Sequence, residues 1–207
     1  VLEASDVPAT VFCTAGYVGS EQPFWWDRLA ALLLAPERLP PTLAIDVGNL
    51  HWCQDLGPAM SSNSEPGARL AFYREVWARL RPLAEADRAL ALEAIAAWSA
   101  DAGVAQTPIA LSHQQLSTLA ASPLIEVGAH SVTHAALPAL TSEAQRREIG
   151  QSKVQLEAMI GRPVRHFAYP FGDQSAETAA LVRDAGFASS CTTEHGAVRA
   201  GTDLFQL

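Results

Sequence analysis

The chain has 207 residues, of which 49% are hydrophobic and 17% are charged, a composition typical of a globular protein and not of a disordered chain. The 14 Lys and Arg residues against 22 Asp and Glu residues give a net charge of −8, which argues against nucleic acid as a partner. A neutral or cationic ligand such as a sugar fits this charge better, and no apolar run is long enough to span a membrane.

The first residues predict the tail of a helix followed by a buried strand. Residues 1–5 have no helix start signal, and Asp6-Val7-Pro8 is a turn into the β-branched and apolar run of residues 9–14. Because the chain begins inside an element, we expect that an earlier strand of the domain is missing. The unpaired sheet edge would favour association, for example as a dimer. The sequence contains no targeting signal and does not indicate a cellular compartment.

Residues 23–103, approximately, predict a mainly helical insertion between two βα units of one domain that spans residues 1–207. A helix over residues 24–34 ends before Pro36, and residues 40–46 predict a short strand or hairpin arm. Residues 61–67 predict a polar loop. Two helices follow over residues 68–83 and 85–100, separated near Pro82, with Gly103 as a C-terminal cap.

After Gly103, helices and strands alternate regularly. Ser112 and Gln115 form a capping box, Thr141-Ser142 opens a long helix, and Gly161 ends it. Such alternation predicts a mainly parallel sheet, either open or closed into a barrel. The expected elements are helices over residues 112–119, 141–161 (with a Glu143–Arg147 pair) and 176–185, and strands over residues 124–127, 164–169, 187–192 and from 204 onward.

The three cysteines, Cys13, Cys53 and Cys191, are odd in number and far apart in the sequence. We expect three buried free thiols, and therefore neither disulfides nor a cysteine-based metal site.

Two histidines follow the predicted strand over residues 124–127, which Gly128 is expected to break. If the segment after Ala129 turns helically, His130 and His134 lie on one face and can share a divalent cation, because zinc accepts neutral imidazole nitrogen. The spacing alone is weak evidence, since many such pairs are ordinary surface or core histidines. The position directly after a strand favours a metal site, and the Ser131 and Thr133 hydroxyls are candidates for orienting the imidazoles.

The run Phe167-Ala168-Tyr169-Pro170-Phe171-Gly172 also ends a predicted strand. It is either a Pro-Gly turn with aromatic packing or a rigid loop whose backbone N–H at Phe171 is an oxyanion donor. Such a donor contributes about 3–4 kcal/mol of transition-state stabilisation.

Together with residues 126–134 and 7–12, this run resembles the polysaccharide deacetylase family, carbohydrate esterase family four. The aromatic segment over residues 23–27 is similar to members that carry a helical insertion. The resemblance implies a distorted (β/α) barrel, here lacking its first strand, that removes N-acetyl groups from amino sugars in a polysaccharide or glycan.

In this family an Asp and two histidines bind a divalent metal, usually zinc, and a neighbouring Asp acts as the base. The resemblance therefore implies that His130 and His134 are metal ligands, that Tyr169 and Pro170 contact the substrate, and that the Phe171 N–H holds the oxyanion. A later histidine protonates the amine in the family, and His195 is the only histidine after Pro170.

The sequence departs from the family pattern at its acids. No Asp-Asp pair occurs in the chain, and Ala168 stands where the family often has Arg, so the third ligand, the base and its partner are missing from their expected places. Asp46, at the end of a possible strand, and Asp173, after the Pro-Phe-Gly turn, are candidate replacements, although Asp173 is more typical of a solvated turn. We expect the complete protein to be a hydrolase and this chain to bind metal poorly and be inactive.

Two rival interpretations remain. One is a catalytically inactive sugar-binding or scaffold domain in which tryptophans stack on sugar rings (Trp25, Trp26, Trp52 and Trp98). The other is a metal hydrolase of another barrel family that acts on a different amide or ester. The remaining histidines, His51, His113 and His166, are expected to be surface or packing residues.

Overall fold

The computed structural model describes residues 2–58, 66–99 and 110–207, and the chain divides into two compact units. Unit 1 comprises Val1–Ser20 and Ala110–Leu207, and unit 2 comprises Glu21–Ile109. These boundaries lie close to the limits expected for the insertion. The predicted cap at Gly103 and most of the polar loop predicted at residues 61–67 lie outside the described residues.

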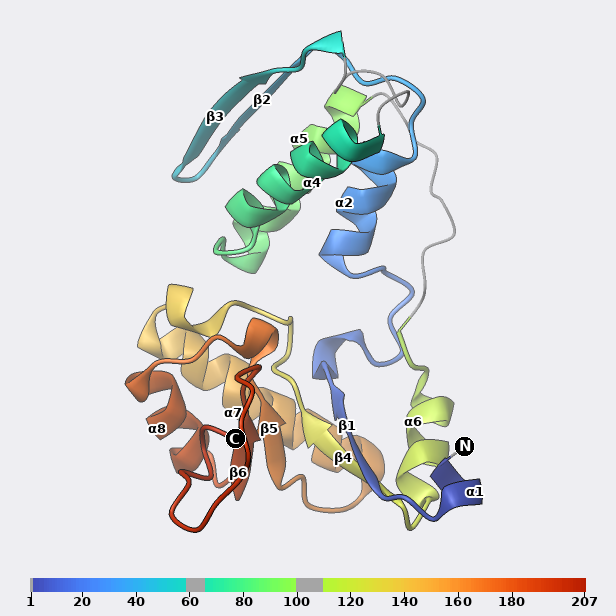
Figure 1. Ribbon diagram of the computed structural model, residues 1–207, viewed down its shortest axis with the longest axis vertical. Coiled ribbons are helices and arrows are strands. Elements are labelled where there is room, and N and C mark those ends of the chain that lie inside the picture. The colour runs from blue at the N-terminus through green and yellow to red at the C-terminus, as the bar shows by residue number, and fades with distance from the viewer. Residues whose placement is uncertain (1, 59–65, 100–109) are drawn as a thin grey trace. The chain divides into compact units, whose positions relative to one another are not determined.

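Unit 1 is built on a four-stranded parallel sheet with the strand order β1-β4-β5-β6 (Figure 1). In the described residues this sheet is open, with β1 and β6 at its edges; closure into a barrel stays a prediction. The fold class is therefore α/β, as expected from the alternation of elements. The elements are α1 (Leu2–Ser5), β1 (Ala9–Cys13), η1 (Ala15–Tyr17), α6 (His113–Ala121), β4 (Ile125–Ala129), η2 (Leu137–Ala139), α7 (Ser142–Ile160), β5 (His166–Ala168), η3 (Pro170–Gly172), α8 (Ala176–Asp184) and β6 (Ser189–Cys191).

One face of the sheet forms a single hydrophobic core with α6, α7 and α8. Val127 and Phe167 on the strands are buried in it, together with Ile149 and Leu156 of α7. Because side chains alternate along a strand, Glu126 and His166 lie on the opposite face. Burying the apolar face stabilises the unit at roughly 25 cal/mol per Å² of apolar surface removed from water.

Helix ends in unit 1 follow the predicted capping signals. The Ser112 and Gln115 side chains form a complete capping box at the start of α6, and Thr141 caps α7. Gly161 ends α7 in the left-handed conformation, with φ of 69°. The predicted i, i+4 pair is also present, with 2.8 Å between Arg147 and Glu143.

The parallel register brings the carboxyl ends of the strands to one edge of the sheet. Cys13 pairs with Ala129, and Ala129 pairs with Phe167, so the segments after β1, β4 and β5 leave the sheet together. Gly128 does not break β4 as expected. It lies within the strand because the ring of Phe12 packs over it, and a Cβ there would meet that ring at 2.4 Å.

Unit 2 contains three helices and a hairpin in its described residues: α2 (Trp25–Leu34), β2 (Thr42–Val47), β3 (Leu50–Asp55), α4 (Pro66–Leu80) and α5 (Glu85–Ser99). The buried side chain of Arg69, only 1% exposed, donates to the carbonyl oxygens of Leu33 and Pro36 just where α2 ends. Burial lowers the pKa of this guanidinium. This arginine satisfies the Leu33 carbonyl, one of those that the end of a helix leaves without an intrahelical partner.

Two expectations about smaller features are wrong. Only Cys13 is buried, whereas Cys53 is exposed and Cys191 is partly exposed, although all three are free thiols. Residues 204–207 form no strand, although they lie along the edge of β6. The Ser190 N–H donates to the Leu204 carbonyl, and the Leu207 N–H donates to the Ser190 carbonyl. Among the described residues, no helix has the length and apolar character that a membrane span requires.

Candidate metal centre

The two histidines after β4 lie side by side, although the segment that carries them is not helical. Residues 130–136 form an irregular loop, so the predicted helical turn is wrong. The imidazole rings of His130 and His134 nevertheless have centroids 4.6 Å apart and planes at 81°. We call residues 130–134 the histidine loop. It brings two potential ligands together by backbone turns at Ser131 and His134, both with φ of 58°.

His130 has one ring nitrogen fixed by the backbone of the next strand. Its Nδ1 lies 2.7 Å from the carbonyl oxygen of Ala168, which can only accept, so Nδ1 carries the proton. Nε2 is thereby left with the lone pair that binds metals. Burial lowers the pKa of the imidazole, and the bond to Ala168 opposes that shift in part. The lowered pKa favours the neutral imidazole, the form in which histidine binds a metal.

His134 packs against both loops at this edge of the sheet. Its ring lies 4.6 Å from that of Phe171, with the planes at 84°. Its backbone N–H donates to the Ser131 hydroxyl at 2.9 Å. The Ser131 hydroxyl thus accepts from the backbone and the Thr133 hydroxyl donates to Glu148, and the role of either hydroxyl in orienting the imidazoles stays a prediction.

Neighbouring segments hold the backbone of the histidine loop on two sides. On one side, the backbone N–H of Gly16 donates to the carbonyl oxygen of Val132, and the backbone N–H of His130 donates to that of Cys13. On the other side, the carboxylate of Glu148 on α7 accepts from the backbone of Val132 and Thr133. Sequence reasoning missed Glu148, because nothing in its local pattern separates it from the other acids of α7.

The turn after β5 has its first two side chains buried. Tyr169 is 2% exposed, and its hydroxyl donates to the Phe205 carbonyl and accepts from Ser190. Burial is the main cause of the raised pKa of this phenol. Pro170 is also buried, and the substrate contact that the resemblance implies for Tyr169 and Pro170 stays a prediction. Phe171 has φ of 61°, a conformation that non-glycine residues rarely adopt.

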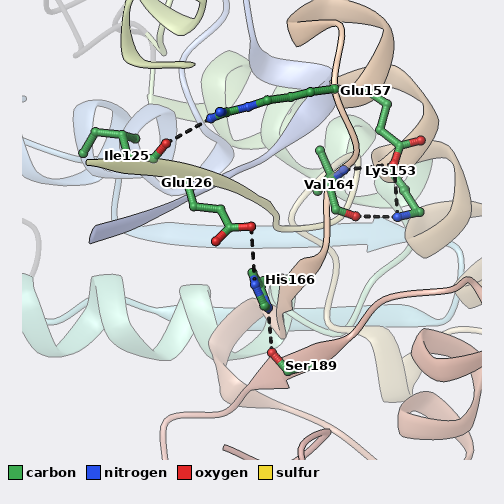
Figure 2. Close-up of polar contacts among 8 residues, drawn as sticks. Ile125, Glu126, Lys153, Glu157, Val164, His166 and Ser189 are labelled. Atoms are coloured by element: carbon green, nitrogen blue, oxygen red, sulfur yellow. Dashed lines mark hydrogen bonds and ion pairs between the residues drawn. The ribbon is translucent and has the colours of Figure 1, made fainter. Parts of the chain in front are cut away.

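The remaining predicted residues lie elsewhere. His195 is exposed in the irregular segment after β6, and His166 lies between Ser189 at 2.7 Å and Glu126 at 3.4 Å (Figure 2). Asp46 pairs with His51 in the hairpin of unit 2. Throughout the described part of the chain, no group of three His, Cys, Asp or Glu side chains is arranged to hold a metal ion. Two imidazoles are thus the donors that the structure brings together.

The family model for polysaccharide deacetylases matches residues 75–190, which is more than half of the chain. The chain belongs to the polysaccharide deacetylase family. This confirms the resemblance found in the sequence motifs. The matched region contains the histidine loop and the turn after β5, and therefore both segments that form the candidate centre.

Individual relatives match the chain over part of their length. It is 27% identical over 97 residues to the Putative polysaccharide deacetylase YxkH of Bacillus subtilis (strain 168), covering 47% of this chain and 34% of that protein. It is similar to the structure of BC0361, a polysaccharide deacetylase from Bacillus cereus, with 28% identity, a TM-score of 0.45, and coverage of 48% of this chain and 31% of that chain.

A further similar structure is that of BA3943, a CE4 family pseudoenzyme from Bacillus anthracis. Its identity is 26% and its TM-score 0.36, with coverage of 38% of this chain and 27% of that chain. The chain thus spans about a third or less of the length of these relatives.

Proposed function

We propose that the complete protein is a metal-dependent carbohydrate N-deacetylase, which hydrolyses the acetamide of N-acetylated amino sugars. One observation carries this proposal: in a chain of the polysaccharide deacetylase family, the His130 and His134 rings lie 4.6 Å apart where parallel strands end. Ligands in α/β folds bind at this edge of the sheet.

The donors present fit zinc in their chemistry. Zinc accepts neutral imidazole nitrogen, and the bond from His130 to Ala168 leaves Nε2 of that ring as the donor atom. When bound, zinc lowers the pKa of a water molecule and polarises a carbonyl group, which suits amide hydrolysis. Catalytic zinc sites usually have three protein ligands, and the described residues supply two. We therefore expect this chain to bind zinc more weakly than a complete site and to be inactive.

Other residues have proposed roles that depend on the centre. The backbone N–H of Phe171 is proposed to donate to the oxyanion, because its ring contacts His134 and its turn follows β5. Of the histidines after Pro170 only His195 is available to protonate the leaving amine, and it is exposed. The buried phenol of Tyr169 is proposed to support the turn from the core.

Acetate release tests the proposal directly. The protein as its gene encodes it is incubated with an N-acetylated amino-sugar oligosaccharide, with zinc and with a chelator. We expect zinc-dependent acetate release that His130→Ala abolishes and His51→Ala, in unit 2, leaves unchanged. Acetate release that continues in the chelator or in His130→Ala would refute the assignment.

The second candidate is a sugar-binding domain without catalysis. The absence of an Asp-Asp pair from the 207 residues favours it, because the family uses those acids as a metal ligand and as the base. Binding of the same oligosaccharide without acetate release at any zinc concentration would support this candidate against the enzyme.

A further inference from the structure

Glu148 joins α7 to the middle of the histidine loop through three hydrogen bonds. Its Oε2 accepts from the backbone N–H groups of Val132 and Thr133, both at 2.9 Å. Its Oε1 accepts from the Thr133 hydroxyl, also at 2.9 Å. One carboxylate thus accepts all three hydrogen bonds. The residue after Glu148 in α7, Ile149, is fully buried and anchors the helix in the core.

The histidine loop offers a binding site that suits a carboxylate. Ser131 has φ of 58°, and the two amides that follow it point toward the same oxygen. Consecutive amides next to a left-handed residue form a concavity that binds anions. Hydrogen bonds from backbone N–H groups to an ionised carboxylate are roughly twice as strong as those between neutral groups.

The contacts of Glu148 lie between the two histidines in the sequence. His130 is held by two hydrogen bonds: its backbone N–H donates to the carbonyl oxygen of Cys13, and its ring Nδ1 donates to that of Ala168. Glu148 holds two of the three residues that separate the two imidazoles in the sequence.

We propose that Glu148 is a positioning residue that holds the His130 and His134 imidazoles adjacent so that both can bind one divalent cation. This inference rests on the proposed function for the metal, but the geometric role of Glu148 can be tested without any metal. Partners that orient metal ligands typically change metal affinity by about 10–100-fold when they are removed.

Two substitutions separate geometry from charge. Glu148→Ala removes all three acceptor contacts. Glu148→Gln keeps an oxygen for the two amides, and its NH2 group can donate to the Thr133 hydroxyl oxygen, so the loop is held without the charge. Glu143→Ala is the matched control, since Glu143 is an exposed acid of the same helix that pairs with Arg147.

The experiment measures the nuclear Overhauser effect between the His130 and His134 ring protons, and then zinc affinity by calorimetry. We expect the ring contact in the wild type, Glu148→Gln and Glu143→Ala, and its loss in Glu148→Ala. Zinc affinity should fall by about tenfold or more in Glu148→Ala and little in the other two variants.

A merely structural role would lower the melting temperature of Glu148→Ala while its ring contact and zinc affinity stay at wild-type values; that result would overturn the proposal. If Glu148→Ala does not fold, Glu148→Asp, whose carboxylate falls one methylene short, replaces it under the same criteria. A wild-type chain that binds no zinc would refute the proposed metal centre, and the ring contact would still decide the role of Glu148.

Discussion

Ser131, His134 and Phe171 share a backbone conformation that side chains usually avoid. Their φ values are 58°, 58° and 61°, and of the non-glycine residues in the described chain, only Asp6 shares a positive φ with them. Each such residue costs about 1–3 kcal/mol, so its surroundings must hold it in place. The strain is concentrated in the two loops that form the candidate centre, which is where function is expected to retain it.

Gly16 provides a test of how tightly the histidine loop is held. A Cβ at this position would lie 2.7 Å from the carbonyl oxygen of Val132, which is backbone and cannot rotate away. We expect Gly16→Ala to lower the free energy of unfolding by about 1–3 kcal/mol and to weaken zinc binding. Chemical denaturation and a zinc titration measure the two effects.

Gly150→Ala is the matched control for that substitution. Gly150 lies within α7, and a Cβ there has no heavy atom within 4 Å. Alanine in a helix is more stable than glycine by roughly 0.5–1 kcal/mol, so this variant should be stabilised and should bind zinc as the wild type does. Equal effects of the two substitutions would show that the loop tolerates displacement of Val132.

At the scale of elements, α7 connects the core to both ends of the sheet. Glu148 holds the histidine loop at the carboxyl end of β4. Farther along the helix, the Glu157 carboxylate accepts from the Val164 amide at 2.9 Å and pairs with Lys153 at 3.1 Å, just before β5 begins (Figure 2). One helix thus fixes the segment that follows β4 and the segment that precedes β5.

The Glu157 contact predicts a pH dependence of stability. The bond from the Val164 amide is the largest cause of the lowered pKa of this carboxyl. Because the folded-state pKa lies below the unfolded value, the stabilisation is fully present above the unfolded pKa near 4.5 and is lost as pH falls through the folded value. Glu157→Gln should cost on the order of 1 kcal/mol at pH 7 and nothing at the lowest pH.

Urea unfolding of Glu157→Gln and the wild type between pH 7 and pH 3 measures that difference. Glu143→Ala serves as the comparison, because its carboxylate is exposed and contacts no backbone amide of another element. A gap between Glu157→Gln and the wild type that stays constant over this pH range would contradict the proposed contribution of the ionised carboxylate.

The elements of unit 1 could be predicted because their signals are local. Ser112, Thr141 and Gly161 act on residues within one turn of the helix ends, and the strands have continuous apolar runs. The hairpin was predicted only in its first arm, because exposed polar residues in β3 (Leu50–Asp55) hide the strand pattern.

The candidate centre could be predicted only in part. The pairing of His130 with His134 was expected through a helical turn, whereas the structure pairs the two rings through an irregular loop. That conformation depends on Glu148 and Cys13, which are distant in the sequence, so no local pattern reports it. The orientation of Tyr169 was missed for the same reason, since its hydroxyl partners lie at Ser190 and Phe205.

At the scale of the whole molecule, the cysteines report on the two units separately. Cys53 is exposed in unit 2, whereas Cys13 and Cys191 lie in unit 1 with their pKa values raised by burial. Because the thiolate is the reactive form, we expect one thiol of the native protein to react promptly with Ellman's reagent and two to react slowly. Cys53→Ser should abolish the prompt phase, and a prompt phase that persists would show that unit 1 opens.

Zinc titration of four proteins tests the central claim of a shared metal centre most directly. Calorimetry is carried out on the wild type, His130→Ala, His134→Ala and His166→Ala, the last being a histidine of the same sheet that bonds to Ser189. We predict one zinc ion per wild-type chain, bound more weakly than at a three-ligand site, its loss in both His130→Ala and His134→Ala, and its retention in His166→Ala. Unchanged zinc binding when either His130 or His134 is replaced would contradict the account.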